Sequence, residues 1–330
     1  YGVELFFMIS GFVIAGSLLR QPGLWAFLRD RFIRIYAAWA PAVVALSLAL
    51  WALRFTVFEN VTPARATAIF LLNFYLVPPF VPKSLQTLDG LQPYVNPSSW
   101  SLTYEWVFYV AAAAALALRF RRDRVGQLLR GCGLALVIAF VVAFPRALFF
   151  VPGLVVFRYV SWFERHKALL RMPWLSLLVF LFAWSMTGAD KAELTETMLD
   201  WLPDGRLLFA LVALLAAIHM FASITLHATP GFAFLQSRPF QFLGRVSYSF
   251  YLWHAPLVSV AKRIVSALIV PRFGPYAGMA CLFCGSLALT VPLAWVSFEL
   301  CEVRFAGWLR GLLTPQPRAA ALQIQTSDAE

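Results

Sequence analysis

Apolar residues run in long stretches along the whole chain, and polar residues gather in the short segments between them. A helix needs about 20 apolar residues to cross a bilayer, whereas a membrane strand needs about 10 of alternating polarity. The runs are long and do not alternate, so they predict helices, which satisfy their own backbone hydrogen bonds in lipid. We expect crossings near residues 2–20, 36–56, 100–119, 132–147, 149–163, 173–188, 206–228, 246–268 and 276–298. The pattern predicts an all-α polytopic membrane protein with about nine transmembrane helices.

The stretch 64–82 is also apolar, but it contains Asn73, Pro78, Pro79 and Pro82 within a short span. Proline removes a backbone donor and interrupts a helix. We therefore expect a re-entrant or interfacial segment here instead of a full crossing.

Composition supports the same class of protein and a single domain. The 330 residues are 61% hydrophobic and 13% charged, with a mean hydropathy of +0.74, which is too apolar for one soluble core. Residues 1–313 should form one integral-membrane domain, because no internal repeat or appended soluble domain is visible. Residues 314–330 are polar and contain two prolines, so they are expected to be a disordered cytoplasmic tail.

The net charge of +11 predicts the orientation of the chain. With residue 1 outside, the cytoplasmic segments are 21–35, 119–131, 164–172, 229–245 and the residues after 299. These segments hold most of the Lys and Arg residues, as the positive-inside rule requires. The positive charge is therefore explained by the orientation of the chain in the membrane. We expect the lipid bilayer as a partner and no nucleic acid.

The chain begins at Tyr1 directly before an apolar run, with neither an initiator Met nor a basic flank. A signal peptide is not expected, because Glu4 stands where its positive region would be. An odd number of crossings with an outside start leads us to expect one further helix upstream, about ten in the complete protein.

The four cysteines predict no disulfide framework. Cys281 and Cys284 lie one helical turn apart in an apolar run, without a second pair or a nearby histidine. We therefore expect neither a metal site nor a bound cofactor.

Glu105 is the most conspicuous candidate for chemistry, because it lies near the start of an apolar run. An ionisable group well inside a bilayer costs roughly 2.5 to 3.5 kcal/mol, so such a group is a functional-site candidate by default. The alternative is that Glu105 lies at the water boundary and caps a helix.

A second candidate is the group Arg29, Arg31 and Arg34, which precedes the second apolar run. The spacing of Arg31 and Arg34 places them on one helical face at the cytoplasmic surface. Planar guanidinium groups suit phosphates, which accept paired charge-assisted hydrogen bonds. The alternative is simple anchoring beside anionic lipid headgroups.

Polar residues are also dense around Tyr248, Tyr251 and His254, inside an otherwise apolar run. Histidine exchanges a proton near neutral pH, although a membrane histidine often only joins two helices by a hydrogen bond. Near the end of the chain, Glu302 is expected either to act in the site or to pair with an arginine, from its own segment or from the loops.

Glu4 is expected at the outer edge of the first crossing. Ser10 and Gly11 follow it in the same run, and small residues allow a second helix to approach closely.

Five blocks of sequence occur in a fixed order along the chain. They are GVELFFMISGF, RFIRIY, WSLTYEWVFY, LGRVSYSFYLWHAPL and FELCEVRF. Together they resemble the successive signatures of the membrane-bound acyltransferase 3 family, which O-acylates bacterial surface glycans. The resemblance implies a multi-pass protein of the bacterial inner membrane. It also implies a cytoplasmic acyl-CoA donor, acetyl-CoA above all, and an acceptor hydroxyl on an extracytoplasmic glycan or glycolipid, such as lipopolysaccharide or exopolysaccharide.

The resemblance also suggests roles for individual residues. Arg31 and Arg34 match the arginine motif that holds the coenzyme A phosphates. Glu105 matches the glutamate of the Trp-Ser-Leu block, His254 the histidine after Tyr-Leu-Trp, and Glu302 the glutamate of the closing block. On this basis Glu105 and His254 are the catalytic candidates.

Three positions depart from the family pattern. Glu4 stands where aspartate is usual, Asp30 where arginine is common, and Arg304 where a proline often follows the last glutamate. The family's essential histidine is also absent from residues 1–20, so we expect it upstream as the general base, with Glu105 or another buried carboxylate orienting it.

Acyl transfer from a thioester passes through an anionic tetrahedral centre, which hydrogen-bond donors stabilise. The candidate donors, or else structural polar groups, are Trp100, Ser101, Tyr248 and Tyr251. Two other classes of protein remain as alternatives. In a transporter or flippase for a glycan or lipid-linked substrate, Glu4, Glu105 and His254 would form a polar pathway. In a helical scaffold or sensor subunit, replacing Glu105, Arg31 or His254 by alanine would leave the phenotype intact.

Overall fold

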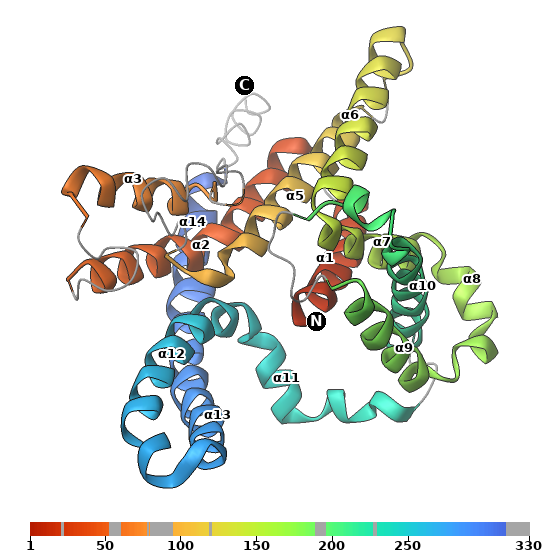
Figure 1. Cartoon of the computed structure of the whole chain (residues 1–330). Helices are drawn as coiled ribbons and strands as arrows, with labels where there is room; N and C mark the ends of the chain where they lie inside the picture. Colours follow the sequence, from red (N-terminus) through yellow and green to blue (C-terminus); the bar gives the residue numbers. More distant parts are fainter. Residues whose placement is uncertain are drawn as a thin grey trace, which may run out of the picture. The chain divides into compact units, whose positions relative to one another are not determined.

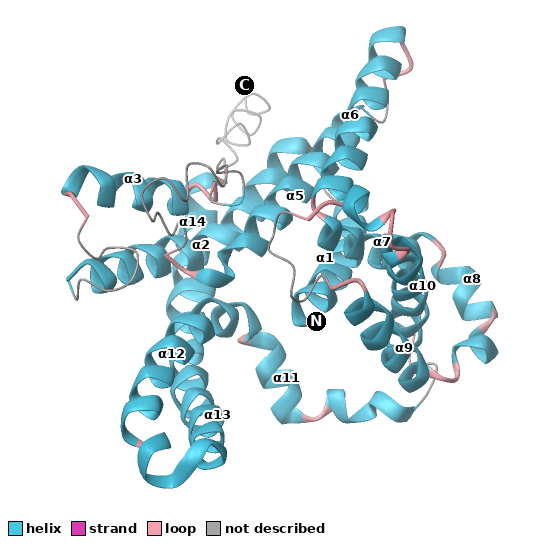
Figure 2. Cartoon of the chain, viewed as in Figure 1, coloured by secondary structure: helices cyan, strands magenta, loops and turns pink. Residues whose placement is uncertain are grey.

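The computed structural model describes residues 1–20, 23–52, 61–77, 79, 95–118, 121–188, 196–226 and 230–314. Throughout this part of the chain the secondary structure is helical, and no strand is present (Figure 2). The long helices are α1 (Gly2–Arg20), α2 (Leu24–Ala52), α5 (Trp100–Leu118), α6 (Arg124–Ala143), α10 (Arg206–Thr225), α12 (Ser247–Leu268) and α13 (Val270–Ser297). The shorter α-helices are α3 (Pro63–Phe74), α7 (Phe150–Arg158), α8 (Val160–Arg165), α9 (Pro173–Met186), α11 (Arg238–Arg245) and α14 (Ala306–Leu313).

Short segments of 3₁₀-helix and one π-helix join these elements. The 3₁₀ segments are η3 (Pro97–Ser99), η4 (Pro145–Phe149), η5 (Lys167–Leu170), η6 (Met198–Trp201) and η7 (Pro230–Gln236). The segment η8 (Phe298–Phe305) is a π-helix that connects α13 to α14. Figure 1 shows the order of these elements along the chain.

Six helical runs within the described residues are long and apolar enough to cross a membrane. They are Gly2–Arg20, Leu24–Ala52, Pro97–Leu118, Arg124–Ala143, Arg206–Thr225 and Val270–Leu313. The prediction of an all-α, multi-pass membrane protein is therefore confirmed. Each of these runs overlaps a crossing expected from the sequence. However, Leu24–Ala52 begins 12 residues and Arg124–Ala143 begins 8 residues before the expected run, and Val270–Leu313 ends 15 residues after it.

The expected count of nine crossings is not supported, because three of the nine runs do not form long apolar helices. The run 149–163 is divided between α7 and α8, since Tyr159 leaves helical geometry (φ −112°, ψ 23°). The run 173–188 contains only the 14 residues of α9. The run 246–268 does form the 22-residue helix α12, but its His, Lys and Arg residues make it less apolar.

The stretch 64–82 contains α3, a helix of 12 residues. At 1.5 Å per residue this helix is about 18 Å long, which is too short to cross a hydrocarbon core of about 30 Å. Its re-entrant or interfacial placement stays a prediction, and Pro78, Pro82 and the tail after residue 314 lie outside the described residues.

The chain is divided into two compact units. The first is made of residues 1–28, 76–80 and 99–245, and the second of residues 29–75, 81–98 and 246–330. The first unit therefore contains α1 and α5 to α11, and the second contains most of α2 together with α3, α12, α13 and α14.

In the first unit, α1 and α7 are in very close contact. A Cβ atom on Gly11 would overlap the carbonyl oxygen of Phe150, and one on Gly153 would overlap that of Met8. The expected close approach at Gly11 is thus confirmed, and it occurs because neither glycine carries a side chain.

Aromatic side chains fill the core of the first unit around this contact. Phe7 of α1 stacks on Phe150 with ring centroids 4.4 Å apart and on Tyr104 of α5 at 5.9 Å. Trp184 of α9 is buried and meets the ring of Phe149 edge-on at 4.7 Å. This core fixes the helices that carry the polar residues of the unit.

In the second unit, α12 and α13 form a helical hairpin, and α14 packs on α2. Ile33 and Ala37 of α2 are buried in one cluster with Ala306 of α14. Near the start of α13, Gly274 takes a left-handed conformation (φ 80°) that interrupts the helix, a geometry that glycine adopts without steric cost.

Candidate functional site

The second unit contains a charged network built on Glu302 of η8. Its side chain is 7% exposed and pairs with Arg34 of α2, with Nη1 and Oε2 3.1 Å apart. Arg34 itself is 47% exposed. The expected pairing of Glu302 with an arginine from another segment is thus present, and its partner belongs to the predicted phosphate-binding group.

The Glu302 carboxylate also caps the N-terminus of α12. Its Oε1 accepts a hydrogen bond from the Ser249 hydroxyl at 2.7 Å and one from the Ser249 backbone N–H at 3.1 Å. The first N–H groups of a helix lack partners within the helix and favour negative charge. Glu302 therefore supplies a cap for α12, where no local side chain provides one.

The π-helical geometry of η8 is part of this arrangement. A π-helix is rare and often occurs at functional sites. It spans Phe298–Phe305 and includes Glu302. Neither Ser249 nor the π-helix was identified from the sequence, because their roles depend on contacts between distant segments.

Tyr248 also contacts the Arg34 region. Its hydroxyl donates to the carbonyl oxygen of Ile35 at 2.8 Å, and the Arg34 guanidinium carbon lies 5.2 Å from the centre of its ring. A cation placed over an aromatic face is attracted by the ring quadrupole. The predicted residues Arg34, Tyr248 and Glu302 are therefore brought together.

Tyr251 and His254 lie further along α12. The Tyr251 hydroxyl donates to the carbonyl oxygen of Ser98 at 2.6 Å. His254 Nδ1 lies 2.7 Å from the carbonyl oxygen of Tyr251. Because a carbonyl oxygen only accepts, Nδ1 donates in this bond and the neutral ring keeps the Nε2 lone pair for a proton.

The other two predicted arginines have different surroundings. Arg29 pairs with its neighbour Asp30 at 2.9 Å, and its Nη1 donates to the hydroxyl of Thr314 at 3.1 Å. Arg31 lies three residues before Arg34 on the same helix and is half-buried. Asp30, which departs from the family pattern, thus accepts hydrogen bonds from two of the Arg29 guanidinium nitrogens.

In the first unit, Glu105 is 4% exposed and lies in the second turn of α5. Its Oε1 accepts hydrogen bonds from the hydroxyls of Ser10, at 3.3 Å, and Tyr109. The carboxylate is therefore buried inside the protein, where it accepts hydrogen bonds from side chains of α1 and α5. Tyr109 was not predicted, although its spacing of four residues places it on the same helical face.

Glu4 lies in a second buried cluster of this unit and is 1% exposed. Trp184 Nε1 donates to its carboxylate at 3.1 Å, and Arg146 of η4 pairs with it at 3.6 Å. The Arg146 guanidinium also lies 5.1 Å from the centre of the Trp100 ring. Arg146 therefore links the predicted residues Glu4 and Trp100.

Sequence reasoning missed Arg146, although a signal was present. A lone arginine at an interruption between two apolar runs carries the same burial penalty that singled out Glu105. Ser101, the remaining predicted residue, is fully buried in α5.

Among the residues that the structure describes, no three His, Cys, Asp or Glu side chains are grouped so as to hold a metal ion. Cys132, Cys281, Cys284 and Cys301 are free thiols.

Comparison with known proteins decides the family. A family model described as an acyltransferase domain, that of the acyltransferase 3 family, matches residues 1–297. The chain belongs to the acyltransferase 3 family. Membership establishes an acyltransferase. The match covers four of the five ordered blocks, because FELCEVRF begins at Phe298, after the matched residues.

Two curated proteins are similar to this acyltransferase 3 chain. The exopolysaccharide production protein ExoZ of Rhizobium meliloti (strain 1021) is 29% identical over 299 residues, covering 87% of this chain and 84% of ExoZ. Nodulation protein 10 of Rhizobium leguminosarum bv. viciae is 29% identical over 138 residues, covering 38% of this chain and 36% of that protein. No solved structure matches.

Proposed function

We propose that the protein transfers an acetyl group from cytoplasmic acetyl-CoA to a hydroxyl of an extracytoplasmic glycan, in the inner membrane of a bacterium. The observation that carries this proposal is the acyltransferase 3 match across residues 1–297. Similarity to ExoZ, an exopolysaccharide production protein, favours a polysaccharide or glycolipid acceptor such as exopolysaccharide or lipopolysaccharide.

For the donor, we assign Arg34 the main contact with the coenzyme A phosphates. The planar guanidinium of Arg34 matches the geometry of phosphate oxygens, with which it can form paired charge-assisted hydrogen bonds. Its side chain is 47% exposed, which leaves it accessible to an anion. Arg31 supports this contact from the same face of α2, and Arg29 contributes less because Asp30 partly neutralises it.

In the reaction, the acceptor oxygen bonds to the acyl carbon and loses its proton to a base. The bond between that carbon and sulfur then breaks, and coenzyme A leaves as a thiol after taking up a proton. Glu105 and the Nε2 atom of His254 are the groups that we assign to proton movement and orientation.

For the oxyanion, Trp100 is the donor that we favour, because Ser101 is fully buried. Tyr248 and Tyr251 already donate to main-chain carbonyls, so we assign them structural roles. Glu4, held by Arg146 and Trp184, is assigned to acceptor binding, because a carboxylate beside an indole ring suits sugar hydroxyls and ring faces.

The proposal is tested by mass analysis of surface glycans from a strain that lacks the protein and from the same strain complemented with it. Loss of an acetyl ester on deletion, and its return on complementation, is expected. A glycan that keeps all its esters but no longer reaches the cell surface would instead indicate a transporter or flippase.

A further inference from the structure

A proline deprives one main-chain carbonyl of α12 of its usual helical partner. In an α-helix, the N–H of residue 256 would donate to the carbonyl oxygen of Leu252, four residues earlier. Residue 256 is Pro256, which lies inside α12 and has no N–H to donate. Leu252 is fully buried, so its carbonyl oxygen needs a donor from within the protein.

Asn96 supplies that donor. Its Nδ2 donates to the carbonyl oxygen of Leu252 at 2.7 Å, and its Oδ1 accepts from the backbone N–H of Ser98 at 3.0 Å. Asn96 is itself fully buried. A carbonyl oxygen only accepts and an N–H only donates, so these two partners determine which end of the amide faces α12. The side chain therefore takes the place of the helical bond that Pro256 cannot form.

The segment 95–98 also holds the residue before Leu252. The Tyr251 hydroxyl donates to the carbonyl oxygen of Ser98 at 2.6 Å, and the carbonyl oxygen of Tyr251 lies 2.7 Å from His254 Nδ1. Because Nδ1 is bonded to the backbone of this turn, the direction of the imidazole ring follows the position of Tyr251 and Leu252. The contacts of segment 95–98 thus act on the turn that orients His254 Nε2.

The segment 95–98 is in turn held by α3. Asn73 Oδ1 accepts from the backbone N–H of Val95 at 2.9 Å, and Asn73 Nδ2 donates to the carbonyl oxygen of Ile69 in its own helix at 2.8 Å. Like Asn96, Asn73 is fully buried, and a buried polar group that loses its partner is costly. Hydrogen bonds therefore connect α3 to the middle of α12, all within the second unit.

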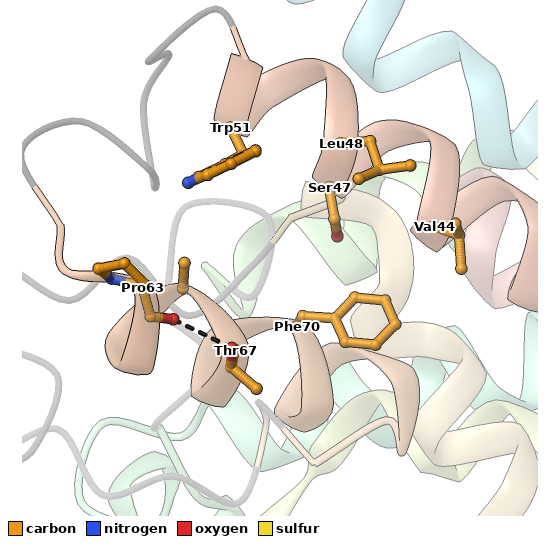
Figure 3. Close-up of a pocket in the computed structure, with 8 residues that line it drawn as sticks. Val44, Ser47, Leu48, Trp51, Pro63, Thr67 and Phe70 are labelled. Atoms are coloured by element: carbon orange, nitrogen blue, oxygen red, sulfur yellow. Dashed lines mark hydrogen bonds between the residues drawn. The ribbon is translucent and has the colours of Figure 1, made fainter.

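A groove beside α3 has a different character. It has a volume of about 310 Å³ and lies between α2 and α3 (Figure 3). None of the described residues that line it is a histidine or carries a charge, so these residues offer no acid or base. We therefore connect α3 to the chemistry of His254 through its C-terminal end, at Asn73.

We propose that Asn96 is a positioning residue for acyl transfer. It holds the carbonyl oxygen of Leu252 in place of the missing N–H of Pro256, and so keeps His254 Nε2 directed at the reacting centre. This inference rests on the proposed function, in which His254 takes part in proton movement. An amide does not exchange a proton at neutral pH, so Asn96 acts only through the turn that it holds. Its replacement should lower kcat and leave KM for acetyl-CoA, which depends on Arg34, unchanged.

The test is a double-mutant cycle with Pro256→Ala, which restores an N–H that can donate to Leu252. With the proline present, Asn96→Ala should lower kcat for acetyl transfer by about 10-fold or more, because a misplaced group loses its reactive geometry. In the P256A background, N96A should lower kcat by about twofold at most, because the helix now supplies the donor. The control S286A removes a buried hydroxyl that bonds to its own helix, α13, and should leave kcat unchanged.

Tyr251→Phe is a milder second variant, because it removes a single oxygen. It releases Ser98 from the same turn and should lower kcat by about threefold, as expected of one ordinary hydrogen bond, with KM for acetyl-CoA unchanged. Unchanged kcat in both N96A and Y251F, an equal loss from N96A in the two backgrounds, or a rise in KM in place of a fall in kcat would each overturn the proposal.

The reactivity of His254 provides a readout that does not depend on catalysis. Diethyl pyrocarbonate modifies the free nitrogen of a neutral histidine, and the rate at His254 is followed by peptide mass spectrometry. N96A should raise this rate by about threefold, because the turn opens more often, and P256A should reverse the rise. His166 is the internal control, since its Nδ1 also lies 2.7 Å from a main-chain carbonyl oxygen, in the first unit.

The two readouts separate this inference from the proposed function. An unchanged chain that forms no acetyl ester on any glycan would count against the proposed function, whereas the modification of His254 still tests the role of Asn96. Equal modification of His254 with and without N96A, or an equal rise at His254 and His166, would overturn the positioning role even in an active enzyme.

Discussion

Glu105 is held by hydroxyl groups from two helices, and this environment determines what its replacement should do. An amide keeps the shape of the side chain and still accepts from Ser10 or Tyr109, but it cannot take up a proton in place of a carboxylate. We expect Glu105→Gln to lower the rate of acyl transfer by about 100-fold or more, with little change in the unfolding temperature. The rate is measured with labelled acetyl-CoA in membranes, beside the control E164Q on an exposed glutamate. A normal rate in the E105Q variant would show that the carboxylate is structural.

Arg34 is half-exposed and pairs with the buried Glu302. Its replacement should therefore weaken the binding of acetyl-CoA more than it destabilises the fold. In Arg34→Ala, Glu302 keeps the two hydrogen bonds from Ser249. We expect KM for acetyl-CoA to rise by about 10-fold, since charge-assisted hydrogen bonds contribute about 1.5 to 3 kcal/mol, while kcat changes less.

The control for Arg34 is R122A, which removes an exposed arginine from another predicted cytoplasmic segment. Arg34→Lys should restore only part of the affinity, because an ammonium group cannot form the planar paired contact. An unchanged KM in R34A would show that the arginine only anchors α2 at the lipid surface.

At the scale of helices, the contact between α1 and α7 is the most sensitive to substitution. Gly11→Ala places a methyl group against the Phe150 carbonyl, and forcing a close-packed interface apart costs about 1 to 3 kcal/mol. The unfolding temperature in detergent should therefore fall.

Gly131 of α6 provides the matched control, because a Cβ atom there has nothing within 4 Å. Gly131→Ala should leave the unfolding temperature unchanged or raise it slightly, since alanine favours a helix over glycine. Equal effects of the two substitutions would mean that the α1–α7 contact does not form in the membrane.

The helices also show what could be read from the sequence and why the rest could not. Apolar runs identified the membrane class and six long spans, because the hydrophobic requirement of a bilayer is local in sequence. They did not report the interruption at Tyr159 or the π-helix around Glu302, because these depend on backbone geometry. The pairs Arg34–Glu302 and Arg146–Glu4 join residues far apart in the sequence, which a single sequence does not place together.

At the scale of the whole molecule, the distribution of charge predicts which segments face the cytoplasm. A cysteine placed at the exposed residue Arg122, in a chain lacking its four native cysteines, should react with an impermeant maleimide only after the membrane is opened. A cysteine at Leu202, in a segment expected outside and also exposed, should react in intact cells. The reverse pattern would invert the topology and place Arg34 on the acceptor side.

The most direct measurement of the central claim is transfer across a sealed membrane. Inverted vesicles that contain the protein receive acetyl-CoA labelled on its acetyl group, which reaches only the cytoplasmic face, and the glycan inside is then analysed. The account predicts label in an alkali-labile ester on that glycan, reduced by both R34A and E105Q. Label that enters the vesicles without covalent attachment, or an ester formed equally by both variants, would contradict it.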